Sequence, residues 1–316
     1  MQKGVAYMCR ETNAAAQEER KDEQAAERNE LEIRYERYRG ILKNLTLMSD
    51  VFMRNVFKER ACTEYVLQVI MGRKDLKVTA QVLQKDYKNL QGRSAVLDCV
   101  VQDGEGRQFD VEIQQDTEGA SPKRARYHSG LVDMNTLRNG EDFDCLPETH
   151  VIFITRNDVL GYGLPIYHIE KRIKEVDAAF RDEAYIIYVN SARQEDTELG
   201  RLMHDFHCKE AKDIHSAVLA RRVHELKETQ EGVEIMCREM DAIYREGEMR
   251  GELRGEKRGE ERGRIEGRKE GQMEKAKEMA ISLANKGISV EHIAEAAKVS
   301  VNLVQEWLSG NKGIVR

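Results

Sequence analysis

Two short runs of apolar residues, 95–101 and 108–114, are separated by a polar link that contains two glycines. Runs of this length with a short glycine-containing connection predict two antiparallel strands joined by a β-hairpin turn. Folding the hairpin about residue 105 sets Asp98 opposite Glu112, because the two lie equally far from that point. Directly opposed side chains lie roughly 4.5–5.5 Å apart at Cβ. We therefore expect two carboxylates to meet on one face of a sheet.

The segments around the hairpin predict a mixed α/β domain over 42–192. Apolar residues recur at three- and four-residue steps in three segments, which predicts helices at 50–57, 62–71 and 121–140. Gly72 is a natural stop for the second helix. The runs 150–155 and 184–189 are apolar throughout, as central strands covered on both faces are, and 166–169 predicts a minor strand. Helices alternating with strands in this order indicate an α/β fold.

Composition changes divide the rest of the chain into four further segments. The first carries Glu, Arg, Ala and Gln with no clear apolar period and predicts a charged helix or disorder. The others are a helical region that packs on the core, a charged glycine repeat and a small helical tail unit. Their ranges are 1–41, 193–244, 245–272 and 273–316.

Glycine occupies every fourth position from 247 to 271, with columns of Glu and Arg between the glycines. In a helix, like charges four residues apart repel, and each glycine costs about 1 kcal/mol relative to alanine. An isolated helix here is therefore marginal. The repeat is either a flexible charged linker or a helix with a partner of matching charge, such as a second copy in a homo-oligomer.

The tail predicts three short helices, at 276–286, 290–297 and 301–308, with the spacing of a helix-turn-helix. The third helix offers Asn302, Gln305 and Glu306 as its polar side chains. A helix that reads DNA usually brings Arg or Lys. The tail therefore favours a packing or oligomerisation unit, with Trp307 as its core anchor.

Composition excludes several classes of protein. The formal net charge is −6, so DNA binding requires a local basic patch. The six cysteines form no Cys-x-x-Cys pair, which argues against a zinc ribbon and a disulfide framework. His204, His207 and Cys208 have the spacing of zinc ligands, but no second cluster completes a tetrahedral site. Without a run of 18 apolar residues we expect no membrane span and a reducing, cytoplasmic location.

The opposed carboxylates of Asp98 and Glu112 suit a hard divalent cation, Mg²⁺ or Mn²⁺, and the backbone carbonyl of Ile113 is a candidate third ligand. Such an ion acidifies a bound water and neutralises charge on a phosphodiester. Gln114 shares the face of Glu112 and is placed to position the water, although an amide cannot act as a base. Glu64, on the preceding helix, is a candidate further carboxylate.

Asp98, a turn and then Glu112-Ile113-Gln114 resemble the PD-(D/E)XK nuclease motif in its glutamine-ending variant. The flanking segments resemble one branch, the Rpn-like recombination-promoting nucleases, also called PD-(D/E)XK nuclease family transposases. In that branch a stretch like 50–57 precedes a helix with an acidic residue, here Glu64. The resemblance covers about 42–310, including the strands and the glycine-repeat tail.

The resemblance implies a restriction-endonuclease-like αβββαβ core with helical C-terminal extensions, which binds Mg²⁺ or Mn²⁺ and hydrolyses DNA. Gln114 stands where most of the superfamily has lysine, and Leu97 stands where many members have proline. The loss of the lysine charge puts the rate in doubt. The alternative is a catalytically inactive protein of the same fold that binds nucleic acid or a partner protein.

The helix after the hairpin carries candidate contacts to a phosphate backbone: Lys123, Arg124, Arg126 and Tyr127. Surface charge on a solvated helix is the alternative explanation. Asp110 shares the face of Glu112 but lies nearer the turn, where we expect it to be solvated.

Overall fold

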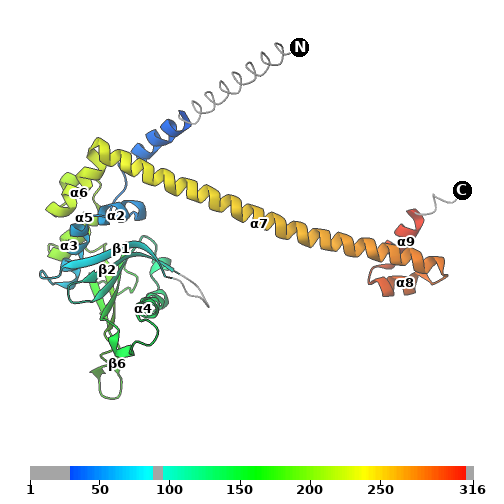
Figure 1. The fold of residues 1–316 in the computed structure, drawn as a ribbon, viewed down its shortest axis with the longest axis horizontal. Coiled ribbons are helices and arrows are strands. Elements are labelled where there is room, and N and C mark those ends of the chain that lie inside the picture. Colours follow the sequence, from blue (N-terminus) through cyan, green and yellow to red (C-terminus); the bar gives the residue numbers. More distant parts are fainter. Residues whose placement is uncertain (1–28, 88–94, 311–316) are drawn as a thin grey trace, which may run out of the picture. The chain divides into compact units, whose positions relative to one another are not determined.

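The computed structural model describes residues 29–87 and 95–310, which form two compact units divided between Ala242 and Ile243. The first unit contains a six-stranded sheet with the strand order β1-β2-β3-β4-β8-β5 (Figure 1). Its strands are β1 (Val78–Tyr87), β2 (Ala95–Asp103), β3 (Gln108–Gln114), β4 (Thr149–Thr155), β5 (Ile166–Ile169) and β8 (Ala184–Asn190). A separate small hairpin is formed by β6 (Arg172–Ile173) and β7 (Ala178–Ala179).

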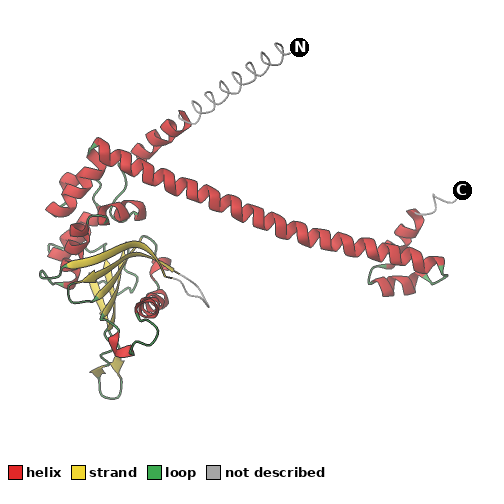
Figure 2. Cartoon of the chain, in the orientation of Figure 1, coloured by secondary structure: helices red, strands yellow, loops and turns green. Residues whose placement is uncertain are grey.

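Helices surround this sheet and continue beyond it (Figure 2). The described chain begins in a helix at 29–42. The α-helices that follow are α2 (Asp50–Phe57), α3 (Arg60–Met71), α4 (Pro122–Thr136), α5 (Glu198–His207), α6 (Ala217–Glu228), α7 (Gln230–Asn285), α8 (Val290–Ala297) and α9 (Val301–Gly310). Three 3-10 helices are η1 (Thr117–Ala120), η2 (Phe143–Cys145) and η3 (Ala211–Asp213).

The hairpin of β2 and β3 has the predicted register. The two strands pair antiparallel, with Cys99 opposite Val111 and Val101 opposite Phe109, so the fold is symmetric about residue 105 as expected. β3 then pairs parallel with β4, and β4 parallel with β8, which confirms the two predicted central strands. The minor strand predicted at 166–169 is β5, antiparallel to β8. The protein is thus a mixed α/β fold.

Strand β1 is an element that the sequence analysis did not name. It pairs antiparallel with β2 at the edge of the sheet. The first half of its sequence alternates apolar residues (Val78, Ala80 and Val82) with polar ones, although in the strand only Val78 and Tyr87 are buried. Such alternation is the signal of a half-covered strand and would have found it.

The two faces of the sheet are covered by different helices. One face contributes Cys99, Val111 and Ile152 to the main core, together with side chains from α2, α3, α5 and α6. The helices predicted in 193–244 therefore pack on the core, as expected. The other face is covered by α4, which contacts β4 and β8, and carries Phe153 and Tyr188. Both faces of β3 and β4 are consequently dry.

Local signals define several helix ends. Gly72 ends α3 in the left-handed conformation with φ 64°, so the predicted stop is confirmed. At the start of α4, Ser121 accepts a hydrogen bond from the backbone N–H of Arg124, and Pro122 occupies the first turn. Of the predicted extension at 1–41, only 29–41 lies within the described residues, and it is helical.

The glycine repeat lies in α7, so of the two alternatives for 245–272 the structure has the helix. In the second unit, the end of α7 packs with α8 and α9 around Ala280, Ile293 and Val304. Trp307 packs against this small core, as expected of its anchor. The predicted first tail helix is wrong as a separate element, because 276–285 continues α7. Among the described helices, none is both long enough and apolar enough to cross a membrane.

Alanine substitutions in the repeat are expected to stabilise α7. A Cβ built on Gly255, Gly259 or Gly263 meets no atom within 4 Å, so the substitution carries no steric cost. Each change is expected to add about 1 kcal/mol of helix stability through lower backbone entropy in the unfolded chain. Thermal melting of the full chain followed by circular dichroism at 222 nm would show the gain.

The matched control is Gly200→Ala in α5. There a Cβ would lie 2.0 Å from the backbone oxygen of Glu195, so this substitution is expected to destabilise the protein. A loss of helix stability in the triple repeat variant would contradict the prediction and would show that the repeat glycines contact another molecule.

Candidate metal centre at the splay of two strands

The regular pairing of β2 with β3 ends one residue before Asp98 and Glu112, at Cys99 and Val111. Beyond that point the backbone donors of each strand are satisfied by a side chain of the other. The N–H of Asp98 donates to Glu112 Oε1 at 2.8 Å, and the N–H of Ile113 donates to Asp98 Oδ2 at 3.4 Å. Each of the two carboxylates therefore reaches the backbone of the other residue's strand, at a splay in the sheet and not within a regular ladder.

The neighbouring strand β1 is distorted at the same place. Gln84 has φ 51°, a left-handed conformation that costs energy for a residue with a side chain. Its Nε2 donates to Asp98 Oδ1 at 3.2 Å. Surrounding contacts must hold a strained backbone of this kind in place. One of those contacts is the hydrogen bond to Asp98.

Arg124 is the cation of the site. From the first turn of α4 its guanidinium donates to Glu112 Oε2 at 3.1 Å and to the carbonyl of Gly119 at 2.8 Å. Its Nε donates to His128 Nε2 at 3.2 Å, one helical turn further on. The Ser121 cap and Pro122 fix the turn from which this side chain projects. Arg124 therefore neutralises part of the charge on Glu112 and holds the adjacent imidazole.

Asp110 and His128 join the site, which the sequence analysis did not expect. The prediction that Asp110 is solvated is wrong, because only 1% of its surface is exposed. The reason is that β3 is a central strand whose second face is covered by α4. His128 Nδ1 lies 3.1 Å from Asp110 Oδ2, and since its Nε2 accepts from Arg124 we assign the proton to Nδ1. Asp110 lies two residues from Glu112 in a buried strand, and that pattern was the available signal.

Burial raises the pKa values of the acidic groups. The pKa of Glu112 is raised to about 9, first by burial and then by the negative charges of Asp110 and Asp98. The pKa of Asp98 is raised to about 6 by burial and by Asp50. Burial also raises the pKa of Asp110 well above its ordinary value and lowers the pKa of His128. Ionised carboxylates here lack sufficient compensating charge.

The carboxylates of Asp110 and Glu112 can hold either a shared proton or a divalent cation. Ligand atoms of Asp110, Glu112 and His128 all lie within 4.8 Å of one another. The two nitrogens of His128 are already engaged by Asp110 and Arg124, so the imidazole supports the carboxylates and is not itself a free ligand. Among the described residues no N–H group reaches Asp110 Oδ1, and a proton on Glu112 or a bound cation would satisfy this oxygen.

A polar cleft of about 510 Å³ opens beside Asp98. Its lining includes Ile113, the predicted candidates Asp98 and Gln114, and the cation Arg124. Glu112 is not part of the lining, because it is fully buried behind Asp98. Gln114 fits because residue 119 is glycine: a Cβ there would lie 2.1 Å from Gln114 Oε1.

Glu64 lies elsewhere. Its two oxygens bind Lys77 Nζ at 2.8 Å and the N–H of Val78 at 3.0 Å, so it fixes the start of β1. It does not line the cleft, and the acidic residue that α2 and α3 contribute to the lining is Asp50. Asp50 is the first residue of α2 and forms an ion pair with Arg54 at 2.7 Å.

The four candidate phosphate contacts gather along α4. They line an adjoining cleft of about 710 Å³, and Arg124 belongs to both clefts. Lys123, Arg126 and Tyr127 are exposed there, while Arg124 is half-buried. A cationic surface thus runs up to the carboxylates.

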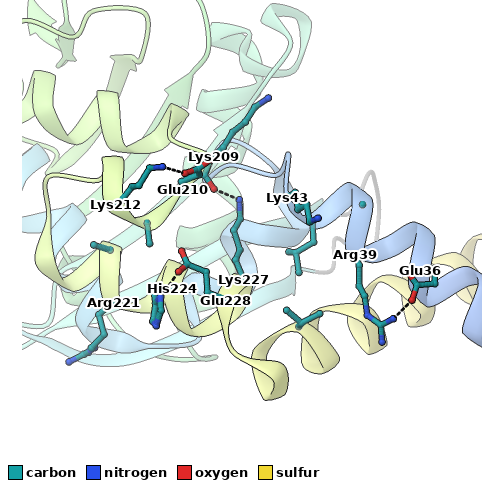
Figure 3. A pocket seen from close by; sticks show the side chains of 15 residues that line it. Glu36, Arg39, Lys43, Lys209, Glu210, Lys212, Arg221, His224, Lys227 and Glu228 are labelled. Atoms are coloured by element: carbon teal, nitrogen blue, oxygen red, sulfur yellow. Dashed lines mark hydrogen bonds and ion pairs between the residues drawn. The ribbon is translucent and has the colours of Figure 1, made fainter.

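A larger cleft of about 1070 Å³ lies between the helix at 29–42 and α6 (Figure 3). Lys and Arg outnumber Glu in its lining. Its half-buried cation Lys227 donates to the carbonyls of Leu45 and Lys209 and lies 4.8 Å from the ring centroid of Phe52. Burial, followed by the charge of Lys209, lowers the pKa of Lys227 to about 8. Because this ammonium is already hydrogen-bonded to two backbone carbonyls, it is not available to a ligand, and we do not place the functional site in this cleft.

The chain was compared with known proteins at three levels. No family model, no curated protein and no solved structure matches it. The geometry described above therefore has to support a function by itself.

The free energy of unfolding is expected to fall as pH rises from about 5 to about 9 in the presence of EDTA. Glu112 has a raised pKa in the folded state, so between its ordinary value and about 9 the folded protein binds a proton that the unfolded chain has released. Stability is then fully present at low pH and lost with increasing pH. Asp98, Asp110, Arg124 and His128 surround this group. Thermal unfolding across the pH series measures the effect.

Glu112→Gln is the matched variant, since an amide of the same size does not titrate. The melting temperature of the variant relative to that of the wild type should rise toward high pH, because only the wild type loses stability there. A parallel pH dependence of the two proteins would rule out the raised pKa.

Proposed function

We propose that the protein is a metal-dependent DNA endonuclease of the PD-(D/E)XK type, related to recombination-promoting nucleases or transposases. The observation that carries the proposal is that Asp98 and Glu112 each accept a backbone N–H from the other's strand, with Asp98 and Arg124 lining one cleft. The order of elements from α3 through β1, β2, β3, α4 and β4 supports it, because that order matches the αβββαβ core of the family.

Asp98, Glu112 and the carbonyl of Ile113 would hold Mg²⁺ or Mn²⁺, with Asp110 and His128 behind them. Both ions prefer oxygen ligands of this kind. When bound, the ion would acidify a water and neutralise charge on the scissile phosphate. The contact of Arg124 with Glu112 would be released as the ion takes over the neutralisation of that carboxylate.

The remaining residues would position the DNA and the nucleophile. Arg124, Lys123 and Arg126 would bind phosphate oxygens on the cationic side of α4. Gln114 would orient the attacking water by a hydrogen bond without accepting its proton. The proton of the attacking water would pass to solvent as the new phosphorus–oxygen bond forms, and the leaving oxygen would take a proton from solvent as its bond to phosphorus breaks, because Asp98 as a ligand of the ion would stay ionised.

The test is cleavage of supercoiled plasmid by the full chain with Mg²⁺ or Mn²⁺, with EDTA as the metal-free arm. Nicked or linear product that depends on the ion is expected. A calorimetric titration of Mn²⁺ runs alongside. Ion binding without cleavage would reject the enzyme and favour the inactive nuclease-fold protein, which a gel-shift assay with DNA then examines. Absence of divalent binding would remove the metal centre itself.

A further inference from the structure

A second group of metal-ligating side chains lies at the end of α5 and shares no residue with the carboxylate site. Ligand atoms of His204, Asp205 and His215 all lie within 4.8 Å of one another. The rings of the two histidines are 4.7 Å apart between centroids. Cys208 adds a thiol, with Sγ 3.4 Å from His204 Nδ1. Two imidazoles and a carboxylate thus converge from one short stretch of chain, and the thiol of Cys208 adjoins the first of these imidazoles.

Backbone contacts prepare this arrangement. Asp205 is fully buried, and its two oxygens accept the N–H groups of His215 at 2.7 Å and Ser216 at 2.9 Å. These bonds fix the segment after η3 against α5, immediately before α6 begins. The side chain of His215 is exposed and that of His204 is 40% exposed, so both rings are open to solvent on one side.

The sequence suggested a different set. His207, which has ligand-like spacing with His204 and Cys208, instead places its Nε2 2.9 Å from the hydroxyl of Ser191. The turn through η3 instead brings His215 next to His204. The tertiary structure thus adds a ligand that the sequence spacing did not suggest.

We propose that His204, Asp205, Cys208 and His215 bind one borderline transition-metal ion of the Zn²⁺ class. Nitrogen, sulfur and a single carboxylate oxygen are the donors that Zn²⁺ selects, whereas Mg²⁺ prefers oxygen. With metal–nitrogen bonds of about 2.0–2.1 Å, ligand atoms in a tetrahedral site lie about 3.3–3.5 Å apart, so the present separations close by small rotations of exposed rings. The ion cross-links the end of α5 to the start of α6.

The alternative without a metal is that Asp205 serves only to hold the backbone of 215–216. The experiment separates the two by changing the exposed rings and leaving Asp205 in place. Full-length protein carrying Asp98→Ala and Glu112→Gln, which together disable the carboxylate site, is dialysed against Zn²⁺, and bound metal is measured by mass spectrometry. His204→Ala, His215→Ala and the control His168→Ala, an exposed histidine of β5, are then added to this background.

The Asp98→Ala, Glu112→Gln protein and its His168→Ala derivative are expected to bind one equivalent of Zn²⁺. The affinity should fall by roughly 100-fold or more in the His204→Ala and His215→Ala derivatives, at least as much as loss of an outer partner of a metal ligand costs. Substitution with Co²⁺ should give the visible bands of a tetrahedral site and a near-ultraviolet thiolate band that Cys208→Ser removes.

Equal Zn²⁺ binding by all of these variants would overturn the proposal, as would no binding at all. A Co²⁺ spectrum without the thiolate band would overturn the four-ligand site. Neither result bears on DNA cleavage, because every protein in the series already lacks Asp98.

Discussion

Replacing Asp98 with alanine is expected to abolish metal-dependent cleavage of plasmid DNA. Asp98 lines the cleft, and its backbone and side chain both contact the partner strand. Its removal takes away one of the two proposed carboxylate ligands of the ion. We expect a loss of at least roughly 100- to 1000-fold, as is usual when one preorganised electrostatic contact is removed. Initial rates of nicking with Mn²⁺ measure it.

Glu112→Gln is expected to lose activity as well, because it keeps the acceptor for the Asp98 N–H but removes the charge. The control is Asp86→Ala, a change to an exposed aspartate of the same sheet, which should cut at the wild-type rate. Equal cutting by wild type and Asp98→Ala would contradict the prediction, since a contaminating nuclease would then account for the activity.

Asp205→Ala is expected to be among the most destabilising single changes in the first unit. The side chain is fully buried and accepts two backbone hydrogen bonds that fix the segment between α5 and α6. Alanine leaves both N–H groups without an acceptor, and each orphaned donor costs about 1–3 kcal/mol. A loss of about 2–5 kcal/mol in the free energy of unfolding follows. Urea denaturation in EDTA measures it with any metal contribution removed.

Two variants calibrate this effect. Asp205→Asn retains one acceptor oxygen and should lose less stability than the alanine variant. Asp196→Ala removes an exposed carboxylate that pairs with Arg201, and such surface pairs contribute about 0–1 kcal/mol. If Asp205→Ala unfolds at the same urea concentration as Asp196→Ala, the backbone contacts of Asp205 do not stabilise the fold as argued.

Much of the α/β unit could be predicted from local patterns. The register of β2 and β3 follows from a short turn placed symmetrically between two apolar runs. The unbroken apolar runs of β4 and β8 indicated strands covered on both faces. Patterns of this kind are local, because a strand buried on both faces requires apolar side chains at every position. Strand β1 shows the limit of such patterns, because its alternation of apolar and polar residues is weak and the sequence analysis did not name it.

The composition of the carboxylate site depended on longer-range packing. Asp110 had a plain local interpretation as a residue near a turn, yet α4 covers it and brings His128 against it. Glu64 had the expected type and helix but binds Lys77 and the start of β1, while Asp50 reaches the cleft. The spacing of residues in the sequence predicts on which face of a helix or strand a side chain lies. It does not predict which other element packs against that face.

Local patterns were sufficient for the register of β2 with β3, because hairpin register is set by chain length around one turn. They also indicated most helices and strands of the first unit, with β1 as an exception, through periodicity that each element carries alone. Long-range packing accounts for the rest: the two strands part at Asp98 and Glu112, Arg124 and His128 contact the buried carboxylates, and His215 in place of His207 lies beside His204. Those contacts join segments that are far apart in the sequence. The packing of whole helices and strands brings the segments together, and no local pattern predicts that packing.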